Sequence, residues 1–266
     1  MHLSLSNKVA LITGGSRGIG AATVRMFTAA GAKVVFSYQK AQSQAEALAK
    51  ECGASKCRPV ASNLDSPASA RALVAEAVKQ FGRLDILVAN HGVWPAEDVP
   101  IDQMTDEQWR STLSINLDSV FGLVKYTVAQ MKAQIKVQME AQQRTASAAG
   151  HVVLISSTSG QRGEAFHVDY SSTKGAIISM TKSLSSELAP IGIYVNCVAP
   201  GWVETDMSKA TLDDPATGDK VRRTIPLGRV GKPEEIAAPV LFLCTEHAGF
   251  ITGEIFNVNG GAVLVG

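Results

Sequence analysis

The sequence predicts an α/β protein built on a single doubly wound parallel sheet of seven strands, with helices on both faces. Short runs of β-branched and aliphatic residues alternate with helical patterns along the chain. Several of these runs, such as residues 9–12 and 86–89, are continuously apolar, which is typical of parallel strands that are covered on both faces. The 266 residues include no linker-like stretch rich in Pro, Gly or Ser, so we expect one domain over residues 1–266.

The elements can be placed in chain order from their apolar runs and their end signals. We expect strands at residues 9–12, 33–36, 58–60, 85–89, 151–155, 194–198 and 254–258. Helices are expected at 18–30, up to about 51, at 68–81, from about 105 onward, around 170 and after 233. Gly31 and Gly82 follow helical segments where C-terminal caps occur, and Pro233 stands in a first helical turn. Strands and helices therefore alternate, as crossover connections between parallel strands require.

Composition and charge exclude several functional classes. The chain has 25 Lys and Arg against 24 Asp and Glu, a net charge of +1, and no basic stripe to support nucleic-acid binding. No apolar run reaches transmembrane length and no charged leader precedes one, so we expect no membrane partner and a cytoplasmic location. The four cysteines Cys52, Cys57, Cys197 and Cys244 include no CxxC pair. This spacing argues against a disulfide framework or a zinc site, and we expect no metal.

A glycine-rich loop directly follows the first predicted strand. Gly14, Gly18 and Gly20 lie within residues 13–20, just before a predicted helix. Glycines at this spacing let the backbone turn tightly and approach a pyrophosphate, while the N-terminus of the helix points toward it. Because the loop lies between a strand and a helix, we interpret it as a dinucleotide-binding loop.

The end of the second strand bears on the choice of dinucleotide. An acidic residue there commonly bonds the ribose 2′-hydroxyl of NAD. Residues 36–40 contain no carboxylate; they supply Ser37 and Lys40, and Arg17 stands in the glycine loop. A 2′-phosphate would therefore meet hydroxyls and cations. We expect NADP(H) as the preferred cofactor, with NAD(H) as the open alternative.

Tyr170 and Lys174 are four residues apart, a spacing that puts a phenol and an ammonium on one face of a helix. A phenol has a pKa of about 10, and a nearby cation favours the phenolate. We interpret the pair as a general acid/base in which Lys174 lowers the pKa of Tyr170. The alternative is a pair of solvated neighbours on a surface helix.

The glycine spacing together with this pair resembles the short-chain dehydrogenase/reductase family, over nearly the whole chain. In that family a serine lies thirteen residues before the tyrosine, and Ser157 stands at this spacing. Asn116 matches the family's asparagine, and the segments 196–205 and 253–261 match the loop beside the nicotinamide and the chain end. The resemblance implies a Rossmann-like fold and the catalytic residues Asn116, Ser157, Tyr170 and Lys174.

The resemblance also implies the binding residues. Cofactor contacts are expected at Gly14, Ser16, Arg17, Gly18, Ile19, Gly20, Ser37, Lys40, Asn63, Leu64, Asn90, Gly92, Tyr170, Lys174, Pro200, Gly201, Val203 and Thr205. Substrate contacts are expected at Trp94, Ser157, Ser159, Phe166 and Trp202, with a substrate loop near residues 206–225. In the family's pattern Ser157 bonds the substrate oxygen, Lys174 binds ribose hydroxyls and Asn116 supports a water relay.

Three features depart from the family pattern. His91 replaces the usual alanine beside the cofactor groove, either as a residue that tunes binding or as a structural hydrogen bonder. Asn63 replaces a common aspartate, and its amide oxygen can still accept a hydrogen bond from the adenine amine. The chain is longer than usual before Ser157, and apolar residues between 128 and 139 recur at helical spacing. We therefore predict an extended helix near residues 131–149.

The resemblance implies an NADP(H)-dependent oxidoreductase that transfers a hydride between nicotinamide and a carbonyl or secondary alcohol. The likeness is strongest to 3-oxoacyl-carrier-protein reductases, which puts 3-oxoacyl thioesters among the candidate substrates. An NAD-linked alcohol or polyol dehydrogenase and a non-catalytic NADP(H)-binding regulatory protein are the alternatives. The resemblance also implies a homotetramer, or a dimer, that forms through the helices containing Asn116 and Tyr170.

Overall fold

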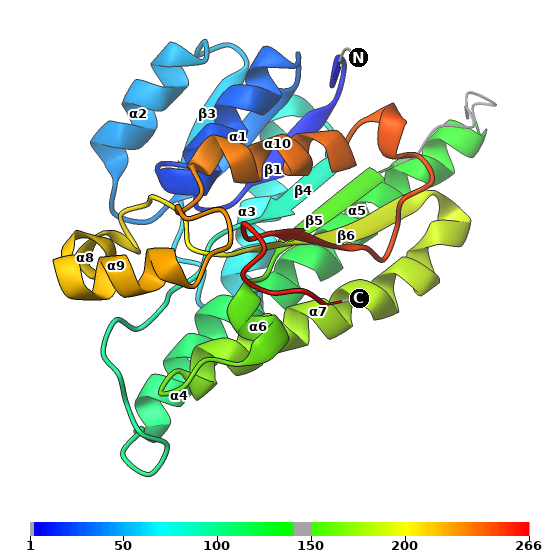
Figure 1. Cartoon of the computed structure of the whole chain (residues 1–266). Helices are drawn as coiled ribbons and strands as arrows, with labels where there is room; N and C mark the ends of the chain where they lie inside the picture. Colours follow the sequence, from blue (N-terminus) through cyan, green and yellow to red (C-terminus); the bar gives the residue numbers. More distant parts are fainter. Residues whose placement is uncertain (1–2, 141–149, 266) are drawn as a thin grey trace.

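The computed structural model describes residues 3–140 and 150–265 and contains one seven-stranded parallel sheet (Figure 1). The strand order is β3-β2-β1-β4-β5-β6-β7, and every neighbouring pair is parallel. The strands are β1 (Val9–Ile12), β2 (Lys33–Tyr38), β3 (Cys57–Ala61), β4 (Ile86–Ala89), β5 (Gly150–Ile155), β6 (Ile193–Pro200) and β7 (Ile255–Val258). The predicted doubly wound fold class is confirmed.

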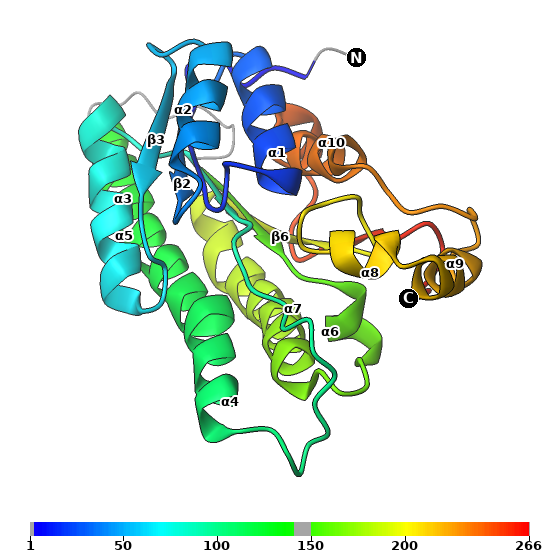
Figure 2. The same ribbon diagram turned by 90° about the vertical axis from the view of Figure 1, so that its left-hand side faces the viewer.

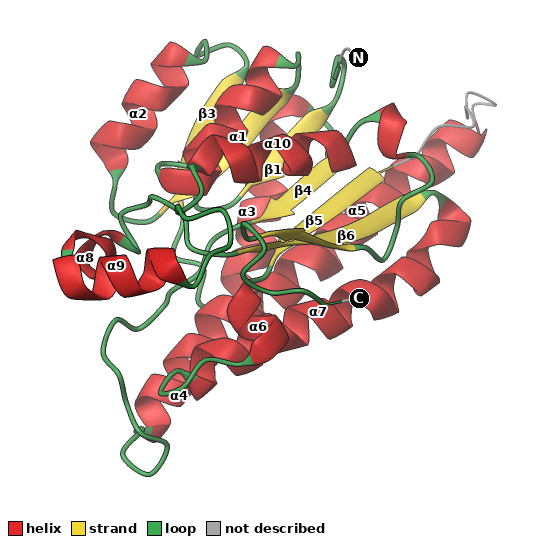
Figure 3. Cartoon of the chain, viewed as in Figure 1, coloured by secondary structure: helices red, strands yellow, loops and turns green. Residues whose placement is uncertain are grey.

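Helices cover both faces of the sheet, which Figure 3 shows as yellow strands between two layers of red helices. Helices α1 (Gly18–Ala29), α2 (Gln42–Glu51) and α10 (Pro233–Leu243) cover one face. Helices α3 (Pro67–Phe81), α5 (Ser119–Glu140) and α7 (Val168–Leu188) cover the other, and α1 and α5 lie far apart in both views (Figures 1 and 2). The short helix α6 (Thr158–Arg162) lies against α7.

Strand β1 shows why the sheet has two cores. Successive side chains of a strand point to opposite faces, so a buried strand feeds both layers. Ala10 and Ile12 pack with Phe27 of α1, whereas Leu11 packs on the other face with Leu123 of α5. All five side chains are fully buried. Burial of a large aliphatic or aromatic side chain contributes about 1.5–3 kcal/mol, which holds the strand between the two layers.

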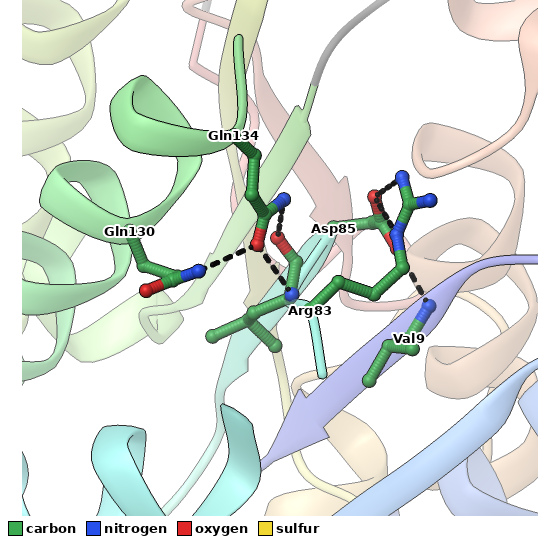
Figure 4. A network of polar contacts seen from close by, with 6 residues as sticks. Val9, Arg83, Asp85, Gln130 and Gln134 are labelled. Carbon is green, nitrogen blue, oxygen red and sulfur yellow. Dashed lines mark hydrogen bonds and ion pairs between the residues drawn. The ribbon is translucent and has the colours of Figure 1, made fainter. Parts of the chain in front are cut away.

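A polar network fastens the end of the sheet where the strands begin (Figure 4). The buried Asp85 carboxylate accepts a hydrogen bond from the Val9 N–H at 2.9 Å and pairs with Arg83 at 2.6 Å. Beside it, the Gln134 side chain of α5 accepts from the Leu84 N–H at 2.8 Å and donates to the Leu84 carbonyl at 3.0 Å. These contacts tie β1, α5 and the chain entering β4 together, because buried backbone groups need partners.

The single long helix predicted from about residue 105 is interrupted. The chain forms α4 (Asp106–Leu113), then a π-helical turn at Ser114–Asp118, then α5. A π-helical turn inserts one residue into the helix and often marks a functional position, and this one contains Asn116. Helix α5 continues to Glu140, so part of the predicted extension is helical, and residues 141–149 lie outside the described residues.

The segment predicted as a substrate loop near residues 206–225 is largely helical. It forms α8 (Lys209–Asp213) and α9 (Pro215–Arg223), joined by Asp214, whose carboxylate caps α9 by accepting from the Thr217 N–H at 2.8 Å. Leu212 and Val221 bury their side chains in a small separate cluster with Ile225. The prediction of a loop was wrong because these apolar residues are too few to show a helical period in the sequence.

Across residues 3–140 and 150–265, no helix combines the length and the hydropathy needed to cross a membrane. The same residues contain no group of His, Cys, Asp and Glu side chains placed to hold a metal ion.

Candidate active site

A cleft of about 610 Å³ opens at the carboxyl ends of the strands. It lies between the loops that follow β1 and β4, the neighbouring strands at which the sheet order reverses. Every predicted cofactor residue, from Gly14 to Thr205, lines this cleft. The predicted substrate residues Trp94, Ser159 and Trp202 line it as well. The fold therefore brings segments spread along the whole chain to one cavity of a size typical for ligands.

The glycine loop has the geometry of a phosphate cradle. Gly14 and Gly18 have φ values of +64° and +52°, a backbone region that favours glycine. A Cβ atom on Gly20 would lie 2.1 Å from the Gly14 carbonyl oxygen, so only glycine fits there. Helix α1 begins at Gly18, and its N-cap residue Arg17 provides no side-chain cap. The first N–H groups of α1 are thus left for a ligand, and the loop fits the pyrophosphate of a dinucleotide.

The groups expected to recognise a 2′-phosphate lie at one end of the cleft. Lys40 lines it, and the Ser37 hydroxyl accepts a hydrogen bond from the Gly14 N–H at 3.2 Å. Arg17 pairs with Asp206 at 3.3 Å, and both side chains are exposed. No local signal in the sequence indicates this ion pair, because its partners are 189 residues apart. Lys40 and Arg17 thus both line the cleft, and Arg17 already has an anionic partner.

Asn63 does not present its amide oxygen as expected. The Oδ1 atom, predicted to accept a bond from the adenine amine, accepts from the Gln39 side chain. The Nδ2 group donates to Asp65 at 2.6 Å. Asn63 and Leu64 line the cleft, and Gln39 occupies one of the two lone-pair positions of the Asn63 oxygen, which leaves the other for a second donor.

Tyr170 and Lys174 lie on the first turns of α7 and face the cleft. The Lys174 Nζ atom lies 5.6 Å from the centre of the Tyr170 ring and donates to the Ile155 carbonyl at 2.9 Å. Ser157 stands at the N-cap of α6, where its hydroxyl accepts from the Ser159 N–H at 3.1 Å. The spacings seen in the sequence therefore converge on one wall of the cleft.

The pKa of Tyr170 differs from the expectation. Burial raises the pKa of Tyr170 to about 12; a hydrogen bond with Ser157 works against this, and the Glu164 carboxylate adds to it. Burial also lowers the pKa of Lys174 to about 8. The predicted lowering of the phenol pKa by Lys174 was wrong for this state of the protein, because removal from water disfavours both charged forms.

Asn116 lies behind the wall of the cleft. Its side chain is fully buried and bonds the backbone of Val93 twice, accepting from the N–H and donating to the carbonyl, each at 2.8 Å. A Cβ atom on Gly92 would lie 3.1 Å from the Asn116 Oδ1 atom and 3.5 Å from the Lys174 Nζ atom. The missing side chain at Gly92 therefore lets Asn116 and Lys174 approach the same stretch of backbone.

His91 is held at both ring nitrogens. Its Nδ1 atom lies 2.8 Å from the Thr13 hydroxyl and its Nε2 atom 2.7 Å from the Ser119 hydroxyl. Because the Ser119 hydroxyl donates to the Ile115 carbonyl at 2.7 Å, it accepts from His91, so Nε2 carries the proton. Burial lowers the pKa of His91 to about 4, and the charge of Lys174 adds to this effect. Of the two interpretations of His91, the contacts favour the structural one.

Aromatic rings line the end of the cleft away from Arg17 and Lys40. Trp94 stacks on His167 with ring centres 5.0 Å apart, and Trp202 meets Trp94 edge-on at 5.9 Å. His167 is buried, with its Nε2 atom 2.8 Å from the Pro95 carbonyl. Phe166 was predicted to contact substrate, but it does not belong to the cleft wall. Its backbone has a φ of +67° and its side chain is half exposed, so its contact with substrate stays a prediction.

Comparison with known proteins agrees with this geometry. The family model described as "Enoyl-(Acyl carrier protein) reductase" matches residues 14–263. The 3-oxoacyl-(acyl-carrier-protein) reductase FabG of Escherichia coli (strain K12) is 37% identical over 263 residues, which cover 99% of this chain and 100% of that protein.

Two solved structures from Brucella melitensis have the same fold. One, named "Short-chain dehydrogenase/reductase SDR:Glucose/ribitol dehydrogenase", has a TM-score of 0.87 and 34% identity, and the match covers 100% of both chains. The other, a 3-ketoacyl-(acyl-carrier-protein) reductase complexed with NADH, has a TM-score of 0.86 and 31% identity, over 98% of this chain and 100% of that one. With the Ser157, Tyr170 and Lys174 cluster beside a dinucleotide cradle, these matches show that the chain belongs to the short-chain dehydrogenase/reductase family.

Proposed function

We propose that this protein reduces the 3-oxo group of an acyl thioester to a secondary alcohol, with NADPH as the hydride donor. Its family membership makes it an NAD(P)-dependent oxidoreductase that acts on a carbonyl or alcohol group. The observation that carries the proposal is the position of Ser157, Tyr170 and Lys174 on one wall of the cleft that the uncapped N-terminus of α1 also lines.

The bound nicotinamide supplies the hydride, which no side chain of the chain can provide. The Ser157 hydroxyl holds the carbonyl oxygen of the substrate beside the phenol of Tyr170. With its pKa raised to about 12, Tyr170 is protonated at neutral pH, which is the form required to donate a proton during reduction. As in the family's pattern, Lys174 would bind the ribose hydroxyls of the cofactor, and Asn116 would support reprotonation of the phenolate through water.

NADPH is supported by the residues at the end of β2. No carboxylate stands in positions 36–40, and Lys40 and Arg17 line the cleft, where both can pair with a 2′-phosphate. The Brucella reductase complexed with NADH and the structure named a glucose/ribitol dehydrogenase favour the alternative, an NAD-linked alcohol or polyol dehydrogenase. Dissociation constants for NADPH and NADH, measured by quenching of tryptophan fluorescence, separate the two; tighter binding of NADH would contradict the proposal.

The names of the curated relatives and the apolar rings of Trp94 and Trp202 support a 3-oxoacyl thioester as substrate. The test is oxidation of NADPH, followed by absorbance, with acetoacetyl thioesters, diketones, quinones and keto sugars. We expect turnover of the thioesters, and Tyr170→Phe should lower kcat at least about 100-fold because it removes the proton donor. NADPH binding by Tyr170→Phe controls for folding.

Other outcomes would overturn parts of this proposal. Turnover of keto sugars but not of thioesters would overturn the substrate assignment. Binding of NADPH without turnover of any compound would favour the alternative of a non-catalytic regulatory protein. Retention of full activity by Tyr170→Phe would contradict the assigned proton donor.

A homotetramer and a cytoplasmic location complete the proposal. Large apolar side chains are exposed on α5 and near the chain end, including Phe121 at 50% and Leu264 at 89% exposure. Such exposed apolar side chains are typical of surfaces that bind another subunit. The four cysteines form no disulfide, as expected for a reducing compartment. Sedimentation velocity tests the assembly, and a monomer at working concentrations would contradict it.

A further inference from the structure

Glu164 is an acidic side chain at the substrate end of the cleft. Among the described residues that line the cleft, two are acidic, Glu164 and Asp206. Asp206 lies at the other end of the cleft and pairs with Arg17. Among the ion pairs of residues 3–140 and 150–265, none includes Glu164. Glu164 therefore contributes a negative charge that no neighbouring cation neutralises directly.

A directional chain of hydrogen bonds holds this carboxylate beside the reacting groups. The Ser159 hydroxyl donates to the Glu164 Oε2 atom at 2.7 Å and lies 2.8 Å from the Ser171 hydroxyl. Since a hydroxyl has one proton, Ser171 donates to Ser159 and Ser159 donates to Glu164. Ser159 also bonds Ser157 through its backbone, and Ser171 directly follows Tyr170. The position of the carboxylate is thus set by neighbours of two catalytic residues.

The charge of Glu164 reaches the site of reaction. Glu164 lines the same cleft as Ser157 and Tyr170, and its carboxylate contributes to the raised pKa of Tyr170. The substrate carbonyl must lie between this phenol and Ser157, so the same charge acts on the substrate. Glu164 is half buried and Arg162 is exposed, so the carboxylate keeps part of its field in the cleft while remaining open enough to solvent for salt to screen it.

We infer that Glu164 is a specificity-determining residue that rejects substrates with a free carboxylate and so restricts the enzyme to neutral carbonyl compounds. Without Glu164, the cations Lys174 and Arg162 would attract an anion into the cleft. This inference rests on the proposed function, since a 3-oxoacyl thioester is the neutral derivative of a 3-oxo acid. Free 3-oxo acids are ionised at neutral pH, because a carboxyl group has a pKa of about 4. The carboxylate of Glu164 therefore selects the activated acyl group over the free acid.

The test compares one anion with two neutral compounds of the same 3-oxo structure. NADPH oxidation is measured at about pH 7 with acetoacetate, ethyl acetoacetate and the acetoacetyl thioester of N-acetylcysteamine. We expect wild-type kcat/KM to be far higher for the neutral compounds. Glu164→Gln keeps the size and the hydrogen-bond acceptor but removes the charge. The variant should raise kcat/KM for acetoacetate, so that the ratio of kcat/KM for the neutral compounds to kcat/KM for acetoacetate falls about tenfold. This is the size expected when one repulsive charge is removed from a partly solvated site.

Two controls separate this effect from damage to the site. Glu164→Asp keeps the charge and should keep the discrimination, which distinguishes charge from a change in shape. Glu76→Gln removes one negative charge on α3, outside the cleft, and should leave the ratio unchanged. In wild type, a rise from about 50 to 500 mM NaCl should raise kcat/KM for acetoacetate relative to that for the neutral ester, because salt screens the repulsion between the two carboxylates.

The outcomes distinguish this inference from the proposed function. A Glu164→Gln variant with the wild-type ratio would overturn the inference alone. If Glu164→Gln does not fold, the salt experiment decides. The inference is then overturned if the ratio of kcat/KM between neutral compounds and acetoacetate in wild type does not change with salt. Absence of wild-type turnover for both neutral compounds would overturn the proposed function, and the inference with it.

Discussion

His151 should make this protein less stable in weak acid. The side chain is 5% exposed at the start of β5, its Nδ1 atom has no hydrogen-bond partner among the described residues, and its ring meets Tyr194 edge-on at 5.8 Å. Burial lowers the pKa of His151 to about 4, and the charge of Lys8 adds to this; a bond to the Leu243 carbonyl opposes it. In the unfolded chain the pKa is about 6.5, so between these values the unfolded state binds more protons. Stability is therefore present above about pH 6.5 and is lost as the pH falls toward 4.

The size of this loss follows from the two pKa values. At about pH 5, the ratio of the binding polynomials of the unfolded and folded chains is roughly 30, which corresponds to a loss of about 2 kcal/mol in the free energy of unfolding. His91, whose pKa is also lowered to about 4, contributes a loss of the same sign. Carboxylates with lowered pKa values, such as Glu235 at about 2, act only at lower pH. The window between pH 6.5 and 5 therefore isolates the buried histidines.

The assay is urea unfolding followed by circular dichroism at about pH 7.5 and pH 5, at one protein concentration because assembly also contributes to stability. Between the two pH values, the free energy of unfolding of His151→Leu should fall by about 2 kcal/mol less than that of wild type. This difference does not depend on how stable the variant is at pH 7.5. Tyr194→Leu removes the neighbouring ring but keeps the imidazole, so its pH-dependent loss should match wild type. Equal losses in His151→Leu and wild type would refute the reasoning.

Three further substitutions test other parts of the structure. Gly20→Ala should weaken NADPH binding at least about tenfold by calorimetry, because its Cβ would lie 2.1 Å from a carbonyl oxygen. The control Gly175→Ala should bind NADPH as wild type does, because the nearest atom would lie 3.4 Å from its Cβ. Equal affinities of the two variants would contradict the role of the glycine loop in cofactor binding. Asp85→Ala should cost about 2–4 kcal/mol in urea unfolding, since it leaves the Val9 N–H without its acceptor, and a loss below about 1 kcal/mol would contradict this. His91→Ala removes the link from the glycine loop to the Ile115 carbonyl in the π-helical turn and to Ser119 at the start of α5. It should lower kcat more than NADPH affinity, and the reverse pattern would assign His91 to cofactor binding.

Much of the fold could be predicted because the signals are local. Continuous apolar runs indicated the seven strands, and the strand-loop-helix context of Gly14, Gly18 and Gly20 indicated the phosphate cradle. The spacing between Ser157, Tyr170 and Lys174 also lies in the sequence, and a helix turns that spacing into a shared face. The π-helical turn at Ser114–Asp118 has no such signal, since it depends on how α4 and α5 pack against their neighbours.

The sequence by itself determined the order of the elements, the loop that can hold a pyrophosphate and the residue types that can transfer a proton. Only the tertiary structure decided the pKa of Tyr170, the pairing of Arg17 with Asp206 and the position of Phe166 outside the cleft wall. It also placed Glu164 in the wall of the same cleft, bonded to Ser159. The physical reason is that backbone propensity acts over a few residues, whereas burial and charge act through space between segments far apart in the chain.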